Sequence, residues 1–274
     1  MLLANRVAII TGGAKGIGRS TAIKFAEEGC DIAIVDISMM EANETVNQVE
    51  KRGREGLAIE CDITDGKKVH GTVNQVINKF GKVDILVNTA GGTGEVKSPD
   101  LLGIANITEE EWDRVVAVNL KGAFLFCKEV VPYMKERKYG KIINFSSLGW
   151  IDPPANSPHY HAAKAGIVGL TNDMACELSP HNIYVNAILP GPIRTPFYDK
   201  VLATRTEQEK DAFFKGIGKT VPLQRVGTSE DVAGVALFLA SELSSFVAGA
   251  SIPVGGGIPL RPSLFQAMSR KGQL

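Results

Sequence analysis

The chain has 274 residues, of which 44% are hydrophobic and 22% charged, and its 30 basic side chains balance its 30 acidic ones. A chain of this length and composition can bury a large core, and its zero net charge gives no reason to expect a nucleic-acid or anionic-membrane partner. The N-terminal sequence MLLANRVAII lacks a signal-peptide pattern, and no apolar run is long enough to span a membrane.

Short apolar runs alternate with helix-length amphipathic stretches along the chain. The runs predict strands at residues 7–10, 32–35, 57–59, 83–87, 141–145, 183–189 and 251–254. Between them we expect helices at 17–28, 39–52, 67–80, 109–135, 160–178 and 230–240. Thr108 and Glu111 have the spacing of a capping box, Pro132 lies near the end of the fourth helix, and Ser229 marks the start of the last. This alternation predicts an α/β fold with a doubly wound parallel sheet.

Two long connections interrupt this alternation. Residues 92–107 contain glycine and proline, and residues 193–222 carry the aromatic side chains Phe197, Tyr198, Phe213 and Phe214. Long connections inside a compact domain are usually functional or mobile, so we interpret residues 193–222 as a substrate lid.

A glycine-rich turn follows the first predicted strand and opens the first helix. In its sequence, TGGAKGIG, residues Gly12, Gly16 and Gly18 would let a pyrophosphate approach the backbone at a helix N-terminus. The spacing is not that of the usual dinucleotide fingerprint, and a plain strand-to-helix turn is the alternative. Its place after an N-terminal buried strand favours dinucleotide binding.

Acidic residues end the second and third predicted strands. Asp36 lies eighteen residues after Gly18, where a carboxylate would bind the adenosine ribose and repel a 2′-phosphate, so the sequence favours NAD over NADP. A helix cap or turn is the alternative role for Asp36, and Lys15 offers a charge that could meet a 2′-phosphate. Asp62 could accept from the adenine amino group or serve as a helix N-cap.

Tyr160 and Lys164 lie one helical turn apart on the same predicted face. A nearby ammonium favours the phenolate, so we expect Lys164 to lower the pKa of Tyr160 from its usual value of about 10. Such a phenol suits an enzyme that shuttles an alcohol proton during hydride transfer. By itself a tyrosine four residues before a lysine is common, and the simpler interpretation is that the two side chains are an exposed pair on the helix surface.

Together these motifs closely resemble those of the short-chain dehydrogenase/reductases, over residues 5–257. The matches occur in the family's order: TGGAKGIG at 11–18, Asp62, NTAG at 88–91, Asn119, Ser146 with Ser147, Tyr160 with Lys164, and PGPIRT at 190–195. The resemblance implies one Rossmann-like domain at 1–257 with about seven strands, followed by a tail at 258–274. It also implies a site at the carboxyl ends of the strands and a homotetramer.

The resemblance further implies a role for each matching residue. Tyr160 would be the general acid/base, Lys164 would assist it, and Ser147, thirteen residues before Tyr160, would bind the substrate oxygen, leaving Ser146 a structural role. Asn119 would hold a water of a proton relay, or else be a buried Asn satisfied by the backbone. NAD would contact the following set: Gly12, Lys15, Gly16, Ile17, Gly18, Asp36, Asp62, Ile63, Asn88, Ala90, Gly91, Tyr160, Lys164, Pro190, Gly191, Ile193 and Thr195.

The chain departs from the family's pattern at three places. Thr89 replaces the second Asn of N-N-A-G, Ala163 replaces the Ser before the catalytic Lys, and VGGG at 254–257 lacks the usual acid. We expect all three to leave the chemistry intact.

Residues after Ser147 are the candidates for substrate contacts. Trp150, Pro153 and His159, with the aromatic part of the lid, predict an apolar wall that suits a ring or an acyl chain. Trp150 and Phe213 could equally be packing residues. We expect His159 and His161 to be structural or to line the substrate site.

These observations support an NAD-dependent oxidoreductase that interconverts a secondary alcohol and a ketone, with an apolar cyclic or acyl small molecule as the substrate. The alternatives are an NADPH-dependent 3-oxoacyl-thioester reductase and a non-catalytic dinucleotide-binding scaffold. The four cysteines are far apart, which predicts reduced thiols, a cytoplasmic location and no metal site. Apolar stripes on helices 109–135 and 160–178 fit a tetramer interface or burial against the sheet, and the tail could reach another subunit or be disordered.

Overall fold

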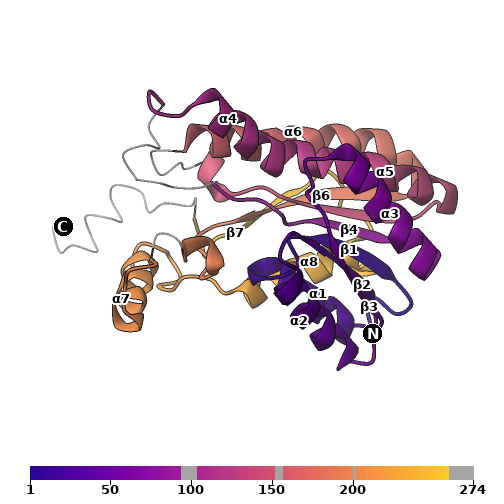
Figure 1. Cartoon of the computed structure of the whole chain (residues 1–274), viewed down its shortest axis with the longest axis horizontal. Coiled ribbons are helices and arrows are strands. Elements are labelled where there is room, and N and C mark those ends of the chain that lie inside the picture. Colours follow the sequence, from indigo (N-terminus) through magenta and orange to yellow (C-terminus); the bar gives the residue numbers. More distant parts are fainter. Residues whose placement is uncertain (94–103, 152–156, 200–201, 259–274) are drawn as a thin grey trace.

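A single parallel sheet forms the centre of the molecule (Figure 1), and the computed structural model describes residues 1–93, 104–151, 157–199 and 202–258. Its seven strands have the order β3-β2-β1-β4-β5-β6-β7, and every neighbouring pair is parallel. The strands are β1 (Val7–Thr11), β2 (Asp31–Asp36), β3 (Gly56–Glu60), β4 (Ile85–Asn88), β5 (Gly140–Phe145), β6 (Ile183–Pro190) and β7 (Ser251–Val254). The predicted Rossmann-like doubly wound sheet is therefore confirmed.

Strands β1, β4 and β5 are buried along their whole length, which explains why their sequences are continuous rather than alternating apolar runs. The strand order reverses between β1 and β4. In open α/β sheets, ligands bind outside the carboxyl ends of the strands at such a switch point.

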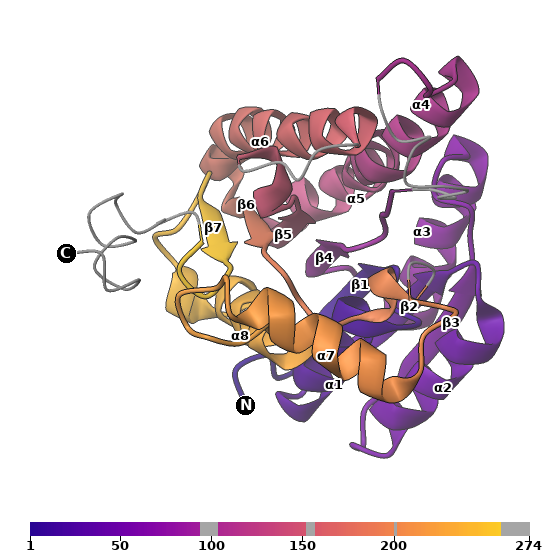
Figure 2. The same ribbon diagram turned by 90° about the vertical axis from the view of Figure 1, so that its left-hand side faces the viewer.

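Helices cover both faces of the sheet, as Figure 2 shows. The first layer contains α1 (Gly16–Glu27), α2 (Met39–Glu50) and α8 (Ser229–Ala240), which pack against each other and the sheet around a core that includes Phe25. The second layer contains α3 (Gly66–Phe80), α5 (Gly122–Arg137) and α6 (Pro158–Leu178), with α4 (Glu109–Val116) against α6. Helix α7 (Glu207–Gly218) lies outside both layers, at the carboxyl ends of the strands.

The prediction of one continuous α-helix over 109–135 was wrong. A π-helical turn, η2 (Ala117–Lys121), separates α4 from α5, and α5 continues through Pro132 to Arg137. Insertions of this kind are invisible to a 3.6-residue pattern and often occur at functional sites. The capping box of Thr108 and Glu111 is confirmed. The last helix begins at Ser229, as expected, and Thr228 before it forms a second capping box with Asp231.

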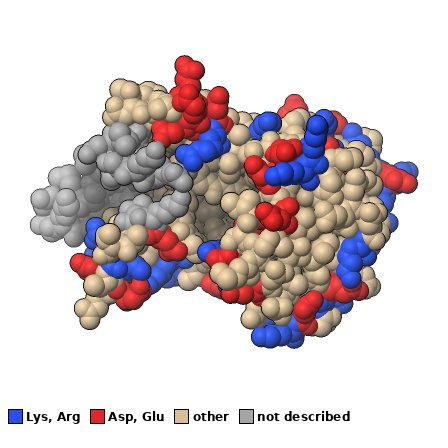
Figure 3. Space-filling view, in the orientation of Figure 1, with Lys and Arg blue, Asp and Glu red and all other residues tan. Residues whose placement is uncertain are grey.

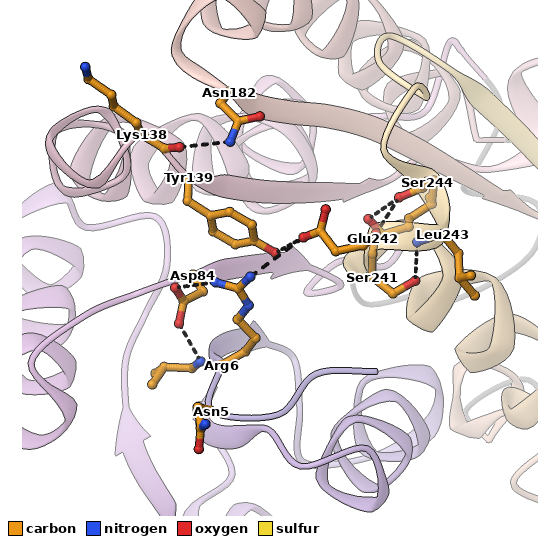
Figure 4. A network of polar contacts seen from close by, with 12 residues as sticks. Asn5, Arg6, Asp84, Lys138, Tyr139, Asn182, Ser241, Glu242, Leu243 and Ser244 are labelled. Atoms are coloured by element: carbon orange, nitrogen blue, oxygen red, sulfur yellow. Dashed lines mark hydrogen bonds and ion pairs between the residues drawn. The ribbon is translucent and has the colours of Figure 1, made fainter. Parts of the chain in front are cut away.

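Charged and aromatic side chains form a network at the amino ends of the strands (Figure 4). Asp84, fully buried, accepts from the Val7 N–H at 2.9 Å and lies 3.0 Å from Lys82 and 3.5 Å from Arg6. Arg6 stacks on Tyr139 with 3.7 Å between its guanidinium carbon and the ring centroid. The Tyr139 hydroxyl donates to Glu242 at 3.0 Å. This network ties β1, β4 and β5 to the segment before β7.

Acidic and basic side chains are interspersed over the described part of the face in Figure 3, as the balanced composition predicts. Among the described helices, none combines the length and apolar character needed to cross a membrane.

Candidate active site

The glycine-rich turn has no room for side chains. A Cβ on Gly18 would lie 2.3 Å from the carbonyl oxygen of Gly12, and a Cβ on Gly12, where φ is +66°, would lie 2.8 Å from the Cα of Ala90. Helix α1 starts at Gly16, and the residue before it, Lys15, makes no side-chain cap. The turn therefore presents uncapped helix N–H groups in a cradle without side chains, which is what a pyrophosphate requires.

Asp36 holds this turn from the end of β2. One carboxylate oxygen accepts from the Ala14 N–H at 3.1 Å, and the other accepts from the Ser38 N–H at 3.1 Å. The residue that caps α2 is Ser38, so Asp36 is not that helix's N-cap. The carboxylate thus stays at the edge of the dinucleotide turn, partly exposed.

The two basic residues beside Asp36 are already engaged. Lys15 forms an ion pair with Glu41 at 2.5 Å, and hydrogen bonds from Lys15 and Ser38 lower the pKa of Glu41 to about 2. Arg19 donates to the Ala14 carbonyl at 2.8 Å and pairs with Glu44 on α2 at 3.2 Å. Each of these two cations is therefore paired with an acidic residue of α2, so a 2′-phosphate bound here would have to compete with that residue.

Asp62, at the end of β3, is not a helix N-cap. It accepts from the Thr64 N–H at 3.0 Å and from the Thr64 hydroxyl at 2.7 Å, and these hydrogen bonds lower its pKa. Asp65 caps α3 instead. Ile63 is buried against Gly122 of α5, so its side chain supports this edge, and its predicted contact with the cofactor stays a prediction.

The Asn88–Gly91 segment joins the central strands to the site. The Asn88 amide donates to Asn144 at 2.9 Å inside the sheet, so its side chain is structural in this conformation. Thr89 donates to the Thr11 carbonyl and the Ala90 N–H donates to the Thr11 hydroxyl at 3.2 Å, which shows how Thr89 is accommodated.

The segment after β6 lies beside the glycine turn. The Gly191 N–H donates to Val254 at 2.9 Å, at the point where Pro190 ends β6, and Ile193 is buried beside Gly227. Thr195 lies opposite Gly16: a Cβ on Gly16 would be 3.6 Å from the Thr195 Cβ. A dinucleotide held by the turn would therefore meet this segment as well.

The catalytic candidates converge at the carboxyl ends of β4 and β5. Ser147 begins the short helix η3 (Leu148–Trp150) and accepts from the Gly149 N–H at 3.0 Å, and its hydroxyl also hydrogen-bonds the Tyr160 phenol. The Lys164 ammonium donates to the Phe145 carbonyl at 2.8 Å and lies 5.6 Å from the Tyr160 ring centroid. Ser146 donates to the Lys164 carbonyl at 2.7 Å, which is the structural role expected of it.

Gly91 is the point where Asn119 and Lys164 meet. A Cβ there would be 2.6 Å from the Asn119 amide oxygen and 3.1 Å from the Lys164 ammonium, so only glycine fits. Asn119, on the π-helical turn, accepts from the Gly92 N–H at 3.0 Å and donates to the Gly92 and Val115 carbonyls at 2.7 and 2.9 Å. This is the backbone-satisfied arrangement; a role for Asn119 in a water relay stays a prediction.

The expected lowering of the Tyr160 pKa was wrong for the protein without its cofactor. Burial raises the pKa of Tyr160 to about 12, although the hydrogen bond with Ser147 opposes this. Burial also lowers the pKa of Lys164 to about 8. The ammonium is desolvated and bonded to a carbonyl, so desolvation outweighs its effect on the phenol.

The predicted substrate residues lie in different environments. Trp150 is 36% exposed on η3, whereas His159 is 2% exposed and its Nδ1 has no hydrogen-bond partner among the described residues. His159 is therefore a buried residue and not an open wall of the cleft. Pro153 lies outside the described residues.

Sequence reasoning missed two features of the site. The ring of His161 packs edge-on against Tyr160, with 5.5 Å between centroids, and its Nε2 would be 2.9 Å from a Cβ on Gly149. Asn144 connects Asn88 to Thr171 of α6 by a 3.0 Å hydrogen bond. His161 and Tyr160 are neighbours on α6, but nothing in local spacing signals the approach of His161 to Gly149 or of Asn144 to Thr171, because each joins the end of a strand to a distant helix. Among the described residues, no cluster of three or more His, Cys, Asp or Glu side chains could hold a metal ion.

Comparisons with known proteins agree with this geometry. A family model described as enoyl-(acyl carrier protein) reductase matches residues 12–259. A subunit of (2S)-((R)-hydroxy(phenyl)methyl)succinyl-CoA dehydrogenase from Thauera aromatica is 39% identical over 257 residues, covering 94% of this chain and 98% of the relative. A 3-oxoacyl-(acyl carrier protein) reductase from Thermotoga maritima is 38% identical over 258 residues, covering 94% and 99%.

Solved structures show the same fold. The crystal structure of an NAD⁺-bound xylitol dehydrogenase is 31% identical, covers 94% of this chain and all of its own (100%), and has a TM-score of 0.85. With the relatives above, this likeness extends over nearly the whole described fold. The chain therefore belongs to the short-chain dehydrogenase/reductase family of oxidoreductases.

Proposed function

We propose that this oxidoreductase uses NAD to interconvert a small secondary alcohol and a ketone. The observation that carries the proposal is the convergence of Ser147, Tyr160 and Lys164 beside Gly91, opposite an uncapped helix N-terminus. A site that transfers hydride must hold a nicotinamide next to a proton donor, and these elements supply both places.

The preference for NAD is supported by the charges around the glycine turn. Asp36 brings a carboxylate to the ribose end of the cleft, while Lys15 and Arg19 are paired with acidic residues of α2. A 2′-phosphate would meet the carboxylate without a free cation to balance it.

Three side chains would have distinct roles in the reaction. Ser147 would donate a hydrogen bond to the substrate oxygen, and Tyr160 would give a proton to that oxygen or take one from it. The Lys164 ammonium, when protonated, would stabilise the phenolate formed in the oxidation direction. The bound nicotinamide would supply or accept the hydride.

A thioester reductase that uses NADPH is the second candidate. It is supported by the 38% identity to the Thermotoga reductase. The Thauera relative, in contrast, is a dehydrogenase of a phenyl-substituted carbinol, which favours a secondary alcohol as the substrate. Asp36 and the ion pair of Lys15 favour the same choice. The homotetramer and the cytoplasmic location stay predictions.

The variant Tyr160→Phe tests the mechanism. We expect kcat/KM for alcohol oxidation to fall by about 10²–10⁴-fold, because the general acid/base is lost, while NADH affinity changes little. Tyr198→Phe is the matched control, since it removes the hydroxyl of a neighbouring tyrosine in contact with Phe197 and should keep most of the activity. Turnover of a verified substrate by Tyr160→Phe at the wild-type rate would contradict the mechanism.

A further inference from the structure

A cluster of aromatic rings extends from the catalytic phenol to helix α7. The Phe197 ring lies 6.2 Å from the Tyr160 ring, measured between centroids, and 5.4 Å from Tyr198. Tyr198 packs edge-on against Phe214 at 5.4 Å and against Phe213 at 6.0 Å. Such distances are those of favourable aromatic pairs.

Phe197 is the member of this cluster that remains open to a ligand. It lies on η5 (Pro196–Tyr198), two residues after Thr195, and its side chain is 48% exposed although its ring contacts Tyr160 and Tyr198. An apolar ring left half exposed beside a reacting group is a surface that an apolar substituent can cover favourably.

The residues around Phe197 are themselves packed against the lid helix and the glycine turn. Phe214 is buried, and Arg194 lies over its ring at 4.9 Å while pairing with Asp211 at 2.7 Å. On the other side, the Pro196 Cδ lies 3.4 Å from where a Cβ on Gly16 would be. The Phe197 ring itself contacts Tyr160 and Tyr198, and Tyr198 in turn packs on the buried Phe214, so the surface that Phe197 offers is backed by other rings.

A second ring, that of His161, also packs on Tyr160, and its surroundings are polar. The imidazole of His161 packs against the phenol, close to Gly149 and the Ser147 hydroxyl. Tyr160 thus contacts both the apolar ring of Phe197 and a more polar group of residues. A carbinol whose oxygen meets Ser147 and Tyr160 would turn its apolar substituent toward Phe197.

We infer that Phe197 is a specificity-determining residue that selects secondary alcohols and ketones bearing a planar aromatic ring on the carbinol carbon. The inference rests on the proposed function and goes beyond it by naming the substituent and the residue that recognises it. An aromatic ring can adopt a tilted or edge-on arrangement with Phe197, as Tyr160 and Tyr198 do, whereas a saturated ring of the same size gains only contact area.

Equilibrium binding of two ketones tests the inference. Acetophenone and cyclohexyl methyl ketone have the same carbon skeleton and differ in whether the ring is aromatic. Each is titrated calorimetrically into the enzyme saturated with NAD⁺, a mixture that cannot turn over. We expect Phe197→Leu, which keeps an apolar side chain, to reduce the preference for acetophenone over the saturated ketone by about threefold to tenfold.

Phe213→Leu is the matched control, because the aromatic partners of Phe213 among the described residues are Tyr198 and Phe214 and not Tyr160. It should leave the ratio of the two dissociation constants unchanged. An unchanged ratio in Phe197→Leu, an equal change in both variants, or failure of both ketones to bind the wild type would overturn the inference.

A parallel assay distinguishes failure of the inference about Phe197 from failure of the proposed function. It measures the oxidation of 1-phenylethanol and 1-cyclohexylethanol with NAD. If either alcohol is oxidised but Phe197→Leu leaves the ratio of the two ketone dissociation constants unchanged, only the role of Phe197 is rejected and the proposed function stands. Absence of turnover together with absence of NADH binding rejects the proposed function.

Discussion

The two ends of the sheet each bury a lysine, and they hold it differently. At the amino end, Lys141 on β5 lies 3.8 Å from the Tyr184 ring centroid, and its ammonium has no hydrogen-bond partner among the described residues. Burial lowers the pKa of Lys141, and the charge of Glu242 in the neighbouring network opposes this. At the carboxyl end, Lys164 has one carbonyl partner at 2.8 Å, and burial alone lowers its pKa.

The surroundings of the two lysines explain this difference. Asp84, Arg6 and Glu242 form ion pairs around the amino ends of the strands, as Figure 4 shows. The carboxyl ends instead present Ser147, Tyr160 and a half-exposed Phe197. One end is arranged to compensate charge and hold strands together. The other places a buried phenol and a buried ammonium side by side with no ion pair among the described residues, an arrangement typical of a functional site.

The largest effect that separates the two ends is expected for Lys164→Met. We expect kcat/KM to fall about a hundredfold or more, since Tyr160 loses the ammonium that assists it. The free energy of unfolding should stay equal or rise, because a shift of the pKa from 10.5 to about 8 corresponds to a burial cost on the order of 3 kcal/mol, and only one hydrogen bond is lost.

The pH dependence of the same variant gives a second readout. Below pH 8 both the folded and unfolded states hold the Lys164 proton, and the cost is constant. Between about pH 8 and 10.5 the unfolded chain keeps a proton that the native state has released, so wild-type stability rises with pH. Lys164→Met should lack that contribution in urea unfolding measured across this range.

Lys141→Met is the matched control at the amino end. Its ammonium is also buried and its pKa also lowered, so the stability change should have the same sign, while kcat/KM should stay within about twofold of wild type. Loss of activity in Lys141→Met equal to that in Lys164→Met would remove the distinction between the two ends.

A smaller effect is expected for Asp84→Asn. The variant weakens the ion pairs with Arg6 and Lys82 at a buried position, and we expect a loss of about 1–3 kcal/mol in urea unfolding with unchanged kcat/KM. Glu242→Gln, at an exposed position of the same network, should cost less than about 1 kcal/mol. A larger loss for Glu242→Gln than for Asp84→Asn would show that burial does not govern this network.

The parts of the fold that depend on local pattern were predictable from sequence. Each of the seven predicted strands is present with ends shifted by at most two residues, because a buried run such as Val83–Val87 carries its own signal. The π-helical turn at Asn119 was not predicted, since a single extra residue barely disturbs helical periodicity.

The sequence predicted which residues belong to the site, but not their electrostatic properties or their contacts with distant segments. Motif order predicted that Ser147, Tyr160 and Lys164 belong together, and the structure brings them together. The direction of the Tyr160 pKa shift could not be predicted, because it depends on how completely the folded chain removes water from the phenol. The approach of His161 to Gly149, and the network around Asp84, depend on contacts between distant segments.

The most direct test of the proposed cofactor is a titration of the wild type, Asp36→Asn and Glu60→Gln with NADH and NADPH. Asn retains an oxygen for the Ala14 N–H, and Glu60 is the register partner of Asp36 on β3, so the control removes a neighbouring charge that makes no contact with the turn. We predict that the wild type prefers NADH, that Asp36→Asn reduces this preference about tenfold or more, and that Glu60→Gln changes it far less. Tighter binding of NADPH than of NADH by the wild type would contradict the account.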